Sequence, residues 1–382
     1  MNKNIIYLDN AATTRTDPRV INEMLKYFDM LYGNPSSVYE FAGKSRDAIE
    51  KSRHIIAKSI NAKDNEIYFT SGGTESDNWA LRGTAKAYKD KGKHIITSKI
   101  EHKAILNTAK NIEDIGFEVS YIDVDERGVI KLQGLKECIR NDTILISVMM
   151  ANNEVGTIEP YENIADIAEK NNVIFHTDAV QCYGHIPINV KKSGIDMLSA
   201  SAHKFNGPKG IGFLYISDDI KKEPMIFGGG QENGMRSGTQ NVPSIVGMAM
   251  AAHIAHENME KRMKNEIMLR DYFIDKVLSE ISFARLNGEK ESRLPGNVNI
   301  SFEFINNAEL IALLDSVGIC ASGGSACSSS KNSPSHVLLS MGLTENMANS
   351  AIRFTLSHNN TKNEIDYTIN CLKYFINNIR KN

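Results

Sequence analysis

Lys204 is the residue whose type and setting first indicate chemistry in this chain. It follows His203 and lies a few residues after the short apolar run Met197–Leu198. Asp178 stands in the same way after the apolar run 173–175. Polar residues at the ends of neighbouring parallel strands meet at one edge of a sheet. A lysine placed there is a candidate for a desolvated amine with a lowered pKa, which Schiff-base formation requires.

By itself, such a lysine is usually a surface residue that closes a strand, so other motifs must decide. The tract 71–74, SGGT, stands between a predicted strand and a predicted helix. Its backbone N–H groups and the Thr74 hydroxyl form a candidate phosphate seat, although many such turns are only helix caps. His102 follows another strand, and Gln181 lies three residues after Asp178. An amine, an acid, a stacking ring and phosphate donors are the parts that a phosphorylated pyridine aldehyde requires.

Cys327 is the second residue that indicates chemistry. It lies in the tract 321–330, ASGGSACSSS, which has no bulky or charged side chain and is predicted to be an exposed, mobile loop. A thiol in such a loop is accessible to react. An odd number of cysteines without a CxxC pair suggests neither a disulfide framework nor a metal site. Cys138 and Cys371 are predicted to be buried in helices. Cys182 is predicted to lie near the Asp178 motif, and Cys320 is predicted to begin a strand.

Composition excludes several classes of partner. The formal net charge of −2 gives no basic excess for binding nucleic acid or an anionic membrane surface. No apolar run approaches the roughly 20 residues of a membrane span, and the first residues lack the apolar core of a signal peptide. We therefore expect a cytoplasmic protein with no nucleic-acid or membrane partner.

The elements that must position these residues alternate between strands and helices as far as residue 243. This alternation predicts an α/β fold with a mostly parallel sheet and helices on both faces. A long helix is then predicted to about residue 281, followed by a half-buried strand of an antiparallel sheet over Asn297–Phe304. We expect a large α/β domain over 15–257 and a smaller α+β domain over 1–14 and 258–382, which carries the Cys327 loop.

The motifs, taken in order, resemble those of a known family. The segments YLDNAATT, GNPSS, TSGGTESDN, EHKA, NNEVG, HTDAVQ, SAHKFNGPKGIG, RSGTQN, SGGSACSS, PSHVL and AIRFTL span residues 5 to 357. They resemble the NifS/IscS-type cysteine desulfurases, which belong to the class V branch of the fold-type I pyridoxal 5′-phosphate (PLP) enzymes. The resemblance implies the PLP-dependent transferase fold type I, with PLP as the cofactor.

The resemblance also implies roles for individual residues. Lys204 would form the Schiff base with PLP and move the substrate's α-proton, Cys327 would be the nucleophile, and His102 would stack on the ring and handle protons. Thr239 would reach the phosphate bound by a partner subunit, from the Gly-rich loop 228–238. The implied cofactor contacts are Gly73, Thr74, His102, Asn153, Asp178, Gln181, Ser201, His203, Lys204 and Thr239. The implied substrate contacts are Asn34, Asn153 and Arg353, with Arg353 as the carboxylate clamp.

The implied reaction converts L-cysteine to L-alanine and leaves the sulfur on Cys327 as a persulfide. The implied partners are a second copy of the chain in a homodimer and a sulfur acceptor, either an iron–sulfur scaffold or a tRNA-thiolating enzyme. The sequence after Cys327, His358 and the short C-terminus depart from the pattern of many relatives. They leave the acceptor open. A selenocysteine lyase, another class V enzyme and a non-catalytic sulfur-carrier scaffold are the alternatives.

Overall fold

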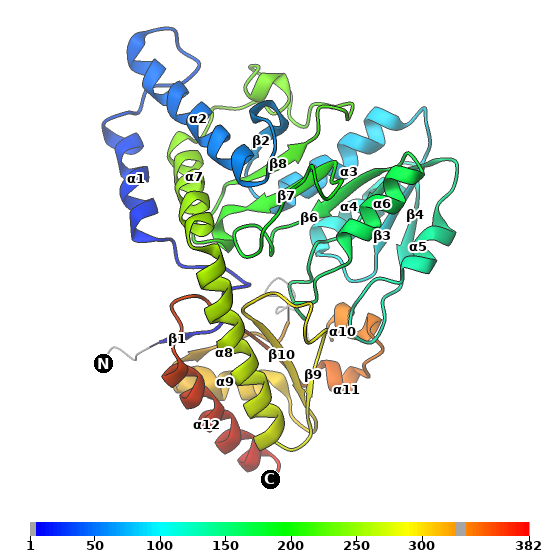
Figure 1. Ribbon diagram of the computed structural model, residues 1–382, viewed down its shortest axis with the longest axis vertical. Coiled ribbons are helices and arrows are strands. Elements are labelled where there is room, and N and C mark those ends of the chain that lie inside the picture. The colour runs from blue at the N-terminus through cyan, green and yellow to red at the C-terminus, as the bar shows by residue number, and fades with distance from the viewer. Residues whose placement is uncertain (1–4, 325–333, 382) are drawn as a thin grey trace.

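The computed structural model describes residues 5–324 and 334–381 as a large α/β body above a smaller α+β body (Figure 1). A seven-stranded sheet forms the centre of the large body. Its strands, in spatial order, are β2 (Ile67–Thr70), β8 (Gly212–Ile216), β7 (Met197–Ser201), β6 (Ile174–Asp178), β5 (Thr143–Ser147), β3 (His94–Ser98) and β4 (Glu118–Ile122). β8 runs antiparallel to both neighbours, and the other pairs are parallel. The predicted fold class is confirmed.

A buried apolar cluster covers each face of this sheet. Neighbouring residues of a strand point to opposite faces, so they belong to different clusters. Ile95 of β3 belongs to one buried apolar cluster and Ile96 to another. Ile174 and Phe175 of β6 divide between the same two clusters. The helices of the large body are α1 (Pro18–Asp29), α2 (Glu40–Ser59), α3 (Gly73–Tyr88), α4 (Lys103–Glu113), α5 (Leu132–Cys138), α6 (Tyr161–Lys170) and α7 (Val242–Glu257).

The smaller body is built on an antiparallel sheet, as predicted. Its spatial order is β12 (Ala351–Thr355), β10 (Asn297–Phe302) and β9 (Ala284–Leu286), and β1 (Ile6–Tyr7) pairs in parallel with β11 (Ile319–Cys320). Its helices are α8 (Met259–Glu280), α9 (Asn307–Ser316), α10 (His336–Ser340), α11 (Glu345–Ala348) and α12 (Lys362–Ile379). No described helix combines the length and the apolar character that crossing a membrane requires.

Two predictions about elements differ from the structure. The long helix predicted from residue 243 is divided at Asn258, which has non-helical dihedral angles, into α7 and α8. The strand predicted to be half-buried is buried along its whole length in β10. Its polar side is covered by chain distant in sequence, because the side chains of Asn297 and Asn299 donate to the carbonyl oxygen of Glu154.

We propose the domain division that the sequence suggested, with its boundary after residue 257. One buried apolar cluster takes its members from residues 6–8 and 269–376 and lies apart from the sheet clusters of the large body. A smaller cluster joins residues 100–155 to residues 337–351 and packs the two bodies together.

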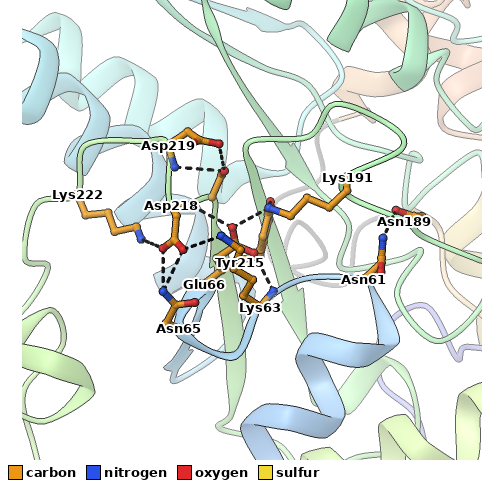
Figure 2. A network of polar contacts seen from close by, with 11 residues as sticks. Asn61, Lys63, Asn65, Glu66, Asn189, Lys191, Tyr215, Asp218, Asp219 and Lys222 are labelled. Carbon is orange, nitrogen blue, oxygen red and sulfur yellow. Dashed lines mark hydrogen bonds and ion pairs between the residues drawn. The ribbon is translucent and has the colours of Figure 1, made fainter.

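A polar network fixes the outer edge of the large sheet, where β2 begins and β8 ends (Figure 2). Glu66 is fully buried at its centre. Its carboxylate accepts hydrogen bonds from Lys191 Nζ at 2.6 Å and from the backbone N–H groups of Lys63 and Asp218 at 2.8 and 3.1 Å. Asp218 in turn accepts from Lys63, Asn65 and Lys222. The network ties the start of β2 to the residues that follow β8.

Candidate active site

A cavity of about 200 Å³ lies at the carboxyl ends of β6 and β7. Ligands of open α/β sheets bind at this edge, outside the carboxyl ends of the strands. Asp178 ends β6 and Ser201 ends β7, and both line the cavity. The backbone of β7 continues into the short 3-10 helix η2 (Ala202–Lys204), which carries Lys204 to the same cavity. The sheet topology therefore brings together residues that the sequence analysis found in separate motifs.

The Lys204 amine is held by a segment from the other end of the chain, residues 9–14, which we call the N-terminal strap. Its Nζ donates to the carbonyl oxygens of Ala11 at 2.5 Å and Ala12 at 2.9 Å. The strap is fixed in turn, because the Thr14 N–H group and hydroxyl both donate to the His203 carbonyl oxygen. His185 Nε2 contacts the Lys204 carbonyl oxygen at 2.8 Å. The amine is thus aimed into the cavity by backbone groups.

Asp178 is the acid at the base of the cavity, and it is only 6% exposed. Burial raises its pKa, while the nearby His102 and Lys204 act to lower it. Its Oδ1 accepts a hydrogen bond from the Val180 N–H group at 2.8 Å. A carboxylate that is buried and has few hydrogen-bond donors is stabilised by a cationic N–H group.

His102 lies at the N-terminus of α4 and lines the cavity. Its Nδ1 accepts a hydrogen bond from the Ala104 N–H group at 3.1 Å, so the ring proton belongs on Nε2. Burial lowers the pKa of His102, so the ring is neutral near pH 7. A neutral ring held by its own backbone suits both stacking on a bound aromatic ring and proton handling.

The N-terminus of α3 forms a seat for an anion on the wall of the cavity. Gly73 and Thr74 open the helix, and among the described residues no side chain caps it. A Cβ on Gly73 would lie 2.5 Å from Val180 Cγ2, so only glycine fits. Ser201 and His203 line the same cavity. Burial and the neighbouring Lys204 lower the pKa of His203 to about 4, which leaves its ring neutral.

Arg353 closes the other side of the cavity from β12 and is 1% exposed. Its Nη2 donates to Asp9 Oδ1 at 2.8 Å, and its Nη1 donates to the Asn153 carbonyl oxygen at 3.0 Å. Its Nε has no hydrogen-bond partner within residues 5–324 and 334–381. The guanidinium is therefore rigidly placed and retains capacity for a further acceptor.

The structure gathers most of the residues that the sequence analysis singled out. Apart from Asn34, Thr239 and Cys327, each of them lines this cavity. Asn34 and Thr239 are exposed and lie outside the cavity of their own chain. Cys327 lies outside the described residues, so its role stays a prediction.

The other cysteines fall in four separate places. Cys182 is fully buried and does not line the cavity, and Cys320 ends β11 rather than beginning a strand. Cys138 and Cys371 were predicted to be buried, but each is only partly buried on the side of its helix. None of the four is in a disulfide. Within the described residues, no group of acidic, His and Cys side chains could hold a metal ion.

Several lining residues were missed by the sequence analysis. The strap residues Ala11 and Ala12 act through backbone carbonyl groups, which no side-chain pattern could reveal. Asp77 also lines the cavity; it is buried, and its Oδ1 lacks a hydrogen-bond partner among the described residues. It belongs to the motif TSGGTESDN, and its place one helical turn after Gly73 was the signal that could have found it.

This fold and this cavity define a known class of enzyme. The family described as Aminotransferase class-V matches residues 6–368, and the chain belongs to it. A protein of Dictyoglomus turgidum named cysteine desulfurase IscS is 48% identical over 99% of this chain and 96% of its own length. A protein of Methanosarcina thermophila with the same name is 47% identical over 98% and 93%. The solved structure of a NifS-like protein has a TM-score of 0.92 and 41% identity, covering 98% of this chain and 99% of its own.

Enzymes of this family depend on PLP, and the chain is a PLP-dependent enzyme. The cavity fits that group on three independent points. The α3 N-terminus and the glycine cradle at Gly73 suit a phosphate. The buried Asp178 suits the ring nitrogen, and the Lys204 amine is aimed into the same space. The residues that would hold PLP in this cavity are the predicted ones that line it, with Asp77 beside them; Thr239 lies outside it.

Proposed function

We propose that the protein is a cysteine desulfurase that converts L-cysteine to L-alanine and transfers the sulfur to Cys327. The observation that carries this proposal is the convergence of Lys204, Asp178 and Arg353 on one cavity. An amine, a ring-nitrogen partner and a carboxylate clamp are what PLP chemistry on a small amino acid requires. Relatives at 48% identity over nearly the whole chain are named for this activity, which supports the same assignment here.

PLP, when bound, supplies an electron sink for the substrate's α-carbon. The chain supplies position and protons. Arg353, oriented by Asp9 and the Asn153 carbonyl oxygen, would bind the substrate carboxylate. The Lys204 amine would take the α-proton, because the strap carbonyls keep Nζ inside the cavity. His102, with its proton on Nε2, would hold a proton beside the leaving sulfur.

The sulfur step balances without an outside oxidant. The Cys327 thiolate attacks the substrate sulfur, so an S–S bond forms and the C–S bond of the substrate breaks. The electron pair of that bond stays with the substrate carbon, which takes up a proton and leaves as L-alanine. Cys327 is left as a persulfide, and the nucleophile that performs this step must be a thiolate.

A Cys327→Ser variant tests this assignment. We expect it to bind the cofactor normally, by its visible absorption, and to lose L-alanine and persulfide formation by at least about 100-fold, because a serine is a far weaker nucleophile toward sulfur. Cys371→Ser, on α12 and away from the cavity, is the control and should behave as wild type. Wild-type rates in Cys327→Ser would refute the role of this thiol.

The homodimer is also a proposal, and two features support it. Thr239 and Asn34 are exposed and do not line the cavity of their own chain, although the resemblance gives both a role at an active site. In addition, many large apolar side chains are exposed along α1, the loop to α2 and the start of α2, segments that follow one another in Figure 1. These side chains are Ile21, Leu25, Phe28, Met30, Tyr32, Val38, Tyr39 and Phe41.

Placing a charge in this apolar surface tests the dimer. We expect Phe28→Glu to sediment as a monomer and to hold the cofactor more weakly, because Thr239 of the partner subunit would no longer complete the phosphate site. Tyr374→Glu is a matched control, since Tyr374 is similarly exposed on α12 (65% against 63% for Phe28). A Phe28→Glu protein that remains dimeric at micromolar concentration would contradict this interface.

For the acceptor we retain an iron–sulfur scaffold or a tRNA-thiolating enzyme, with the cytoplasm as the site of action. A persulfide forms only from a reduced thiol, and the cytoplasm keeps thiols reduced. The four described cysteines are all unpaired, as this setting requires. Incubating each candidate acceptor with persulfidated protein made from ³⁵S-labelled cysteine would identify the one that takes up the label.

A further inference from the structure

A second cavity, of about 580 Å³, lies where α7 meets α8, against the start of α1 and the turn that follows Lys204. Figure 1 shows the beginning of α1 beside the lower end of α7. This cavity shares no lining residue with the active-site cavity and has almost three times its volume. Its size falls within the roughly 300–1,000 Å³ that is typical of small-molecule sites. We call it the hinge cavity.

The hinge cavity has an apolar floor and a cationic side. The floor is formed by Phe205, Ile254 and alanines of α7. The cationic side is formed by Lys261, Arg262 and Lys264 of α8, and no ion pair between described residues involves any of the three. The remaining charged lining residues, Asp17 and Arg19, neutralise one another in a bidentate pair with distances of 3.0 and 2.8 Å. The wall therefore carries an uncompensated positive charge.

Arg262 is the least exposed of these cations. Its Nη1 donates to the Ala255 carbonyl oxygen at 3.4 Å, and its Nε is buried without a hydrogen-bond partner in the described chain. Burial lowers the pKa of Arg262, although the nearby Glu266 acts to raise it. Glu266 is a weak counter-charge, because burial raises its own pKa to about 7. A guanidinium removed from water with so few partners would be stabilised by an added anion.

His358 adds a neutral polar group to the same wall. Burial and the nearby Arg262 lower its pKa, so the ring is uncharged at pH 7. Its Nδ1 is buried and has no hydrogen-bond partner within residues 5–324 and 334–381. The lining thus offers an apolar floor, a clustered positive charge and an unsatisfied imidazole.

We propose that the hinge cavity binds a small molecule that carries one carboxylate on an apolar body, with the carboxylate at Arg262 and the apolar part against Phe205 and Ile254. The charge on the wall selects the anion, and the floor selects the apolar body. None of the described residues that line the cavity is a cysteine or a serine, so we expect the molecule to bind without reacting.

The position of the cavity links binding to the active site. Phe205, which forms part of the floor, and Asn206 both line the cavity and directly follow Lys204 in the chain. Asn206 is hydrogen bonded to the strap by its N–H group, which donates to Thr14 Oγ1 at 2.8 Å, and it accepts from the Asp17 N–H group at 3.0 Å. His358 lies just after β12, the strand that carries Arg353. An occupant would contact the segments that hold both the amine and the carboxylate clamp, so we expect it to regulate the enzyme.

Calorimetric titration of the holoenzyme with sodium octanoate tests the site, with 1-octanol as the neutral probe of the same length. We expect one octanoate per chain and binding of 1-octanol weaker by about tenfold or more, the usual effect of losing a charge-assisted hydrogen bond. Arg262→Gln should weaken octanoate binding by a similar factor. Arg285→Gln, an exposed arginine on β9, is the control and should bind as wild type.

A second variant tests the same site if Arg262→Gln folds poorly. Ile254 is half-buried in the floor, so the larger side chain of Ile254→Trp should occupy the space of the apolar body and abolish octanoate binding. Ile254 does not line the active-site cavity. Saturating octanoate should change kcat or KM for L-cysteine at least about twofold in the wild type and not in Ile254→Trp. The proposal is overturned if octanoate fails to bind below about 10 mM, or if Arg262→Gln and Arg285→Gln bind it equally. Neither outcome depends on whether L-cysteine is the substrate.

Discussion

Two buried acids, Asp77 and Asp178, share the base of the active-site cavity, and only one can carry the negative charge. Burial raises the pKa of both carboxyl groups. The charge on Asp178 raises the pKa of Asp77 further, whereas the Val180 N–H group and the Lys204 charge stabilise the ionised form of Asp178. Like charges this close separate into one acid and one base. Asp178 therefore holds the charge, and Asp77 holds a proton.

Replacing each acid by its amide distinguishes these roles. We expect Asp178→Asn to lower kcat for alanine formation by about 10²–10³-fold, because a preorganised charge at the reacting group is lost. Asp77→Asn should stay within about threefold of wild type, since an amide replaces an already neutral carboxyl group of nearly the same shape. Steady-state kinetics and the pH dependence of the cofactor's visible absorption measure both effects. Equal losses in the two variants would contradict the assignment.

The side chains of the site could largely be predicted from sequence, and its backbone groups could not. Lys204, Asp178 and Arg353 were found because their residue types and motifs indicate their chemistry. The carbonyl groups of Ala11 and Ala12 hold the Lys204 amine, but any residue type would present the same atoms. Their contribution depends on the path of the chain across 192 and 193 residues, which the local pattern does not contain.

The segment between β8 and α7 is held by two ion pairs, and it carries Thr239. Glu232 is buried and accepts from Arg53 Nη1 at 2.7 Å and Nη2 at 2.9 Å, and from Gln240 at 2.7 Å. Arg236 makes a bidentate pair with Glu75 on α3, with distances of 2.8 and 3.1 Å. The N-terminus of α3 also forms the phosphate seat. The Arg236–Glu75 pair therefore ties the position of Thr239 to the cofactor site of its own chain.

Arg53→Gln tests the first of these pairs. Removing Arg53 leaves the buried Glu232 carboxylate without its positively charged partner, which typically costs about 3–5 kcal/mol. We expect that loss in urea unfolding followed by circular dichroism, together with faster loss of cofactor on dialysis. Glu50→Gln is the control, since Glu50 contacts the same arginine from an exposed position, and it should change stability by less than about 1 kcal/mol. If the two variants are equally stable, the segment is held by other contacts.

At the scale of elements, short apolar runs located strands: the run 173–175 overlaps β6 and Met197–Leu198 begins β7, because a short apolar run that ends in polar residues is typical of a buried strand. The break at Asn258 was not predicted, because α8 begins directly after this residue and no loop separates the two helices, although asparagine can end a helix. The burial of β10 was missed for a different reason. Its polar side chains alternate as on a solvent-facing strand, but the Glu154 segment accepts their hydrogen bonds.

At the scale of the whole molecule, the Glu66 network joins the edge strand β2 to its neighbour β8 in the large sheet (Figure 2). Burial acts to raise the pKa of Glu66, but the hydrogen bonds from Lys191, Lys63 and Asp218 outweigh it and hold the pKa below its ordinary 4.5. A lowered folded-state pKa contributes stability that is present above the unfolded pKa and is lost as the pH falls through the folded value. The network therefore stabilises the fold at neutral pH and fails in acid.

Glu66→Gln should lower the free energy of unfolding by about 1–3 kcal/mol at pH 7, because a buried acceptor loses its charge while Lys191 remains partly solvated. The difference from wild type should shrink below about pH 4, where the wild-type carboxyl group is protonated as well. Asp123→Asn, which breaks an exposed pair with Lys99, is the control and should have little effect at any pH. Denaturant unfolding between pH 3 and 7 measures the profile, and a pH-independent difference would contradict it.

The N-terminal strap has a consequence for how the enzyme is made. Asn10 and Ala11 hydrogen bond to Thr355, and Ala11 also holds the Lys204 amine. The strap is therefore translated long before the strand that anchors it. On a ribosome, a nascent chain shorter than about residue 355 lacks the Thr355 anchor of its strap, so its lysine lacks part of the support that aims it. We infer that coenzyme capture follows translation, and that a truncated product ending before this strand would accumulate as a colourless protein.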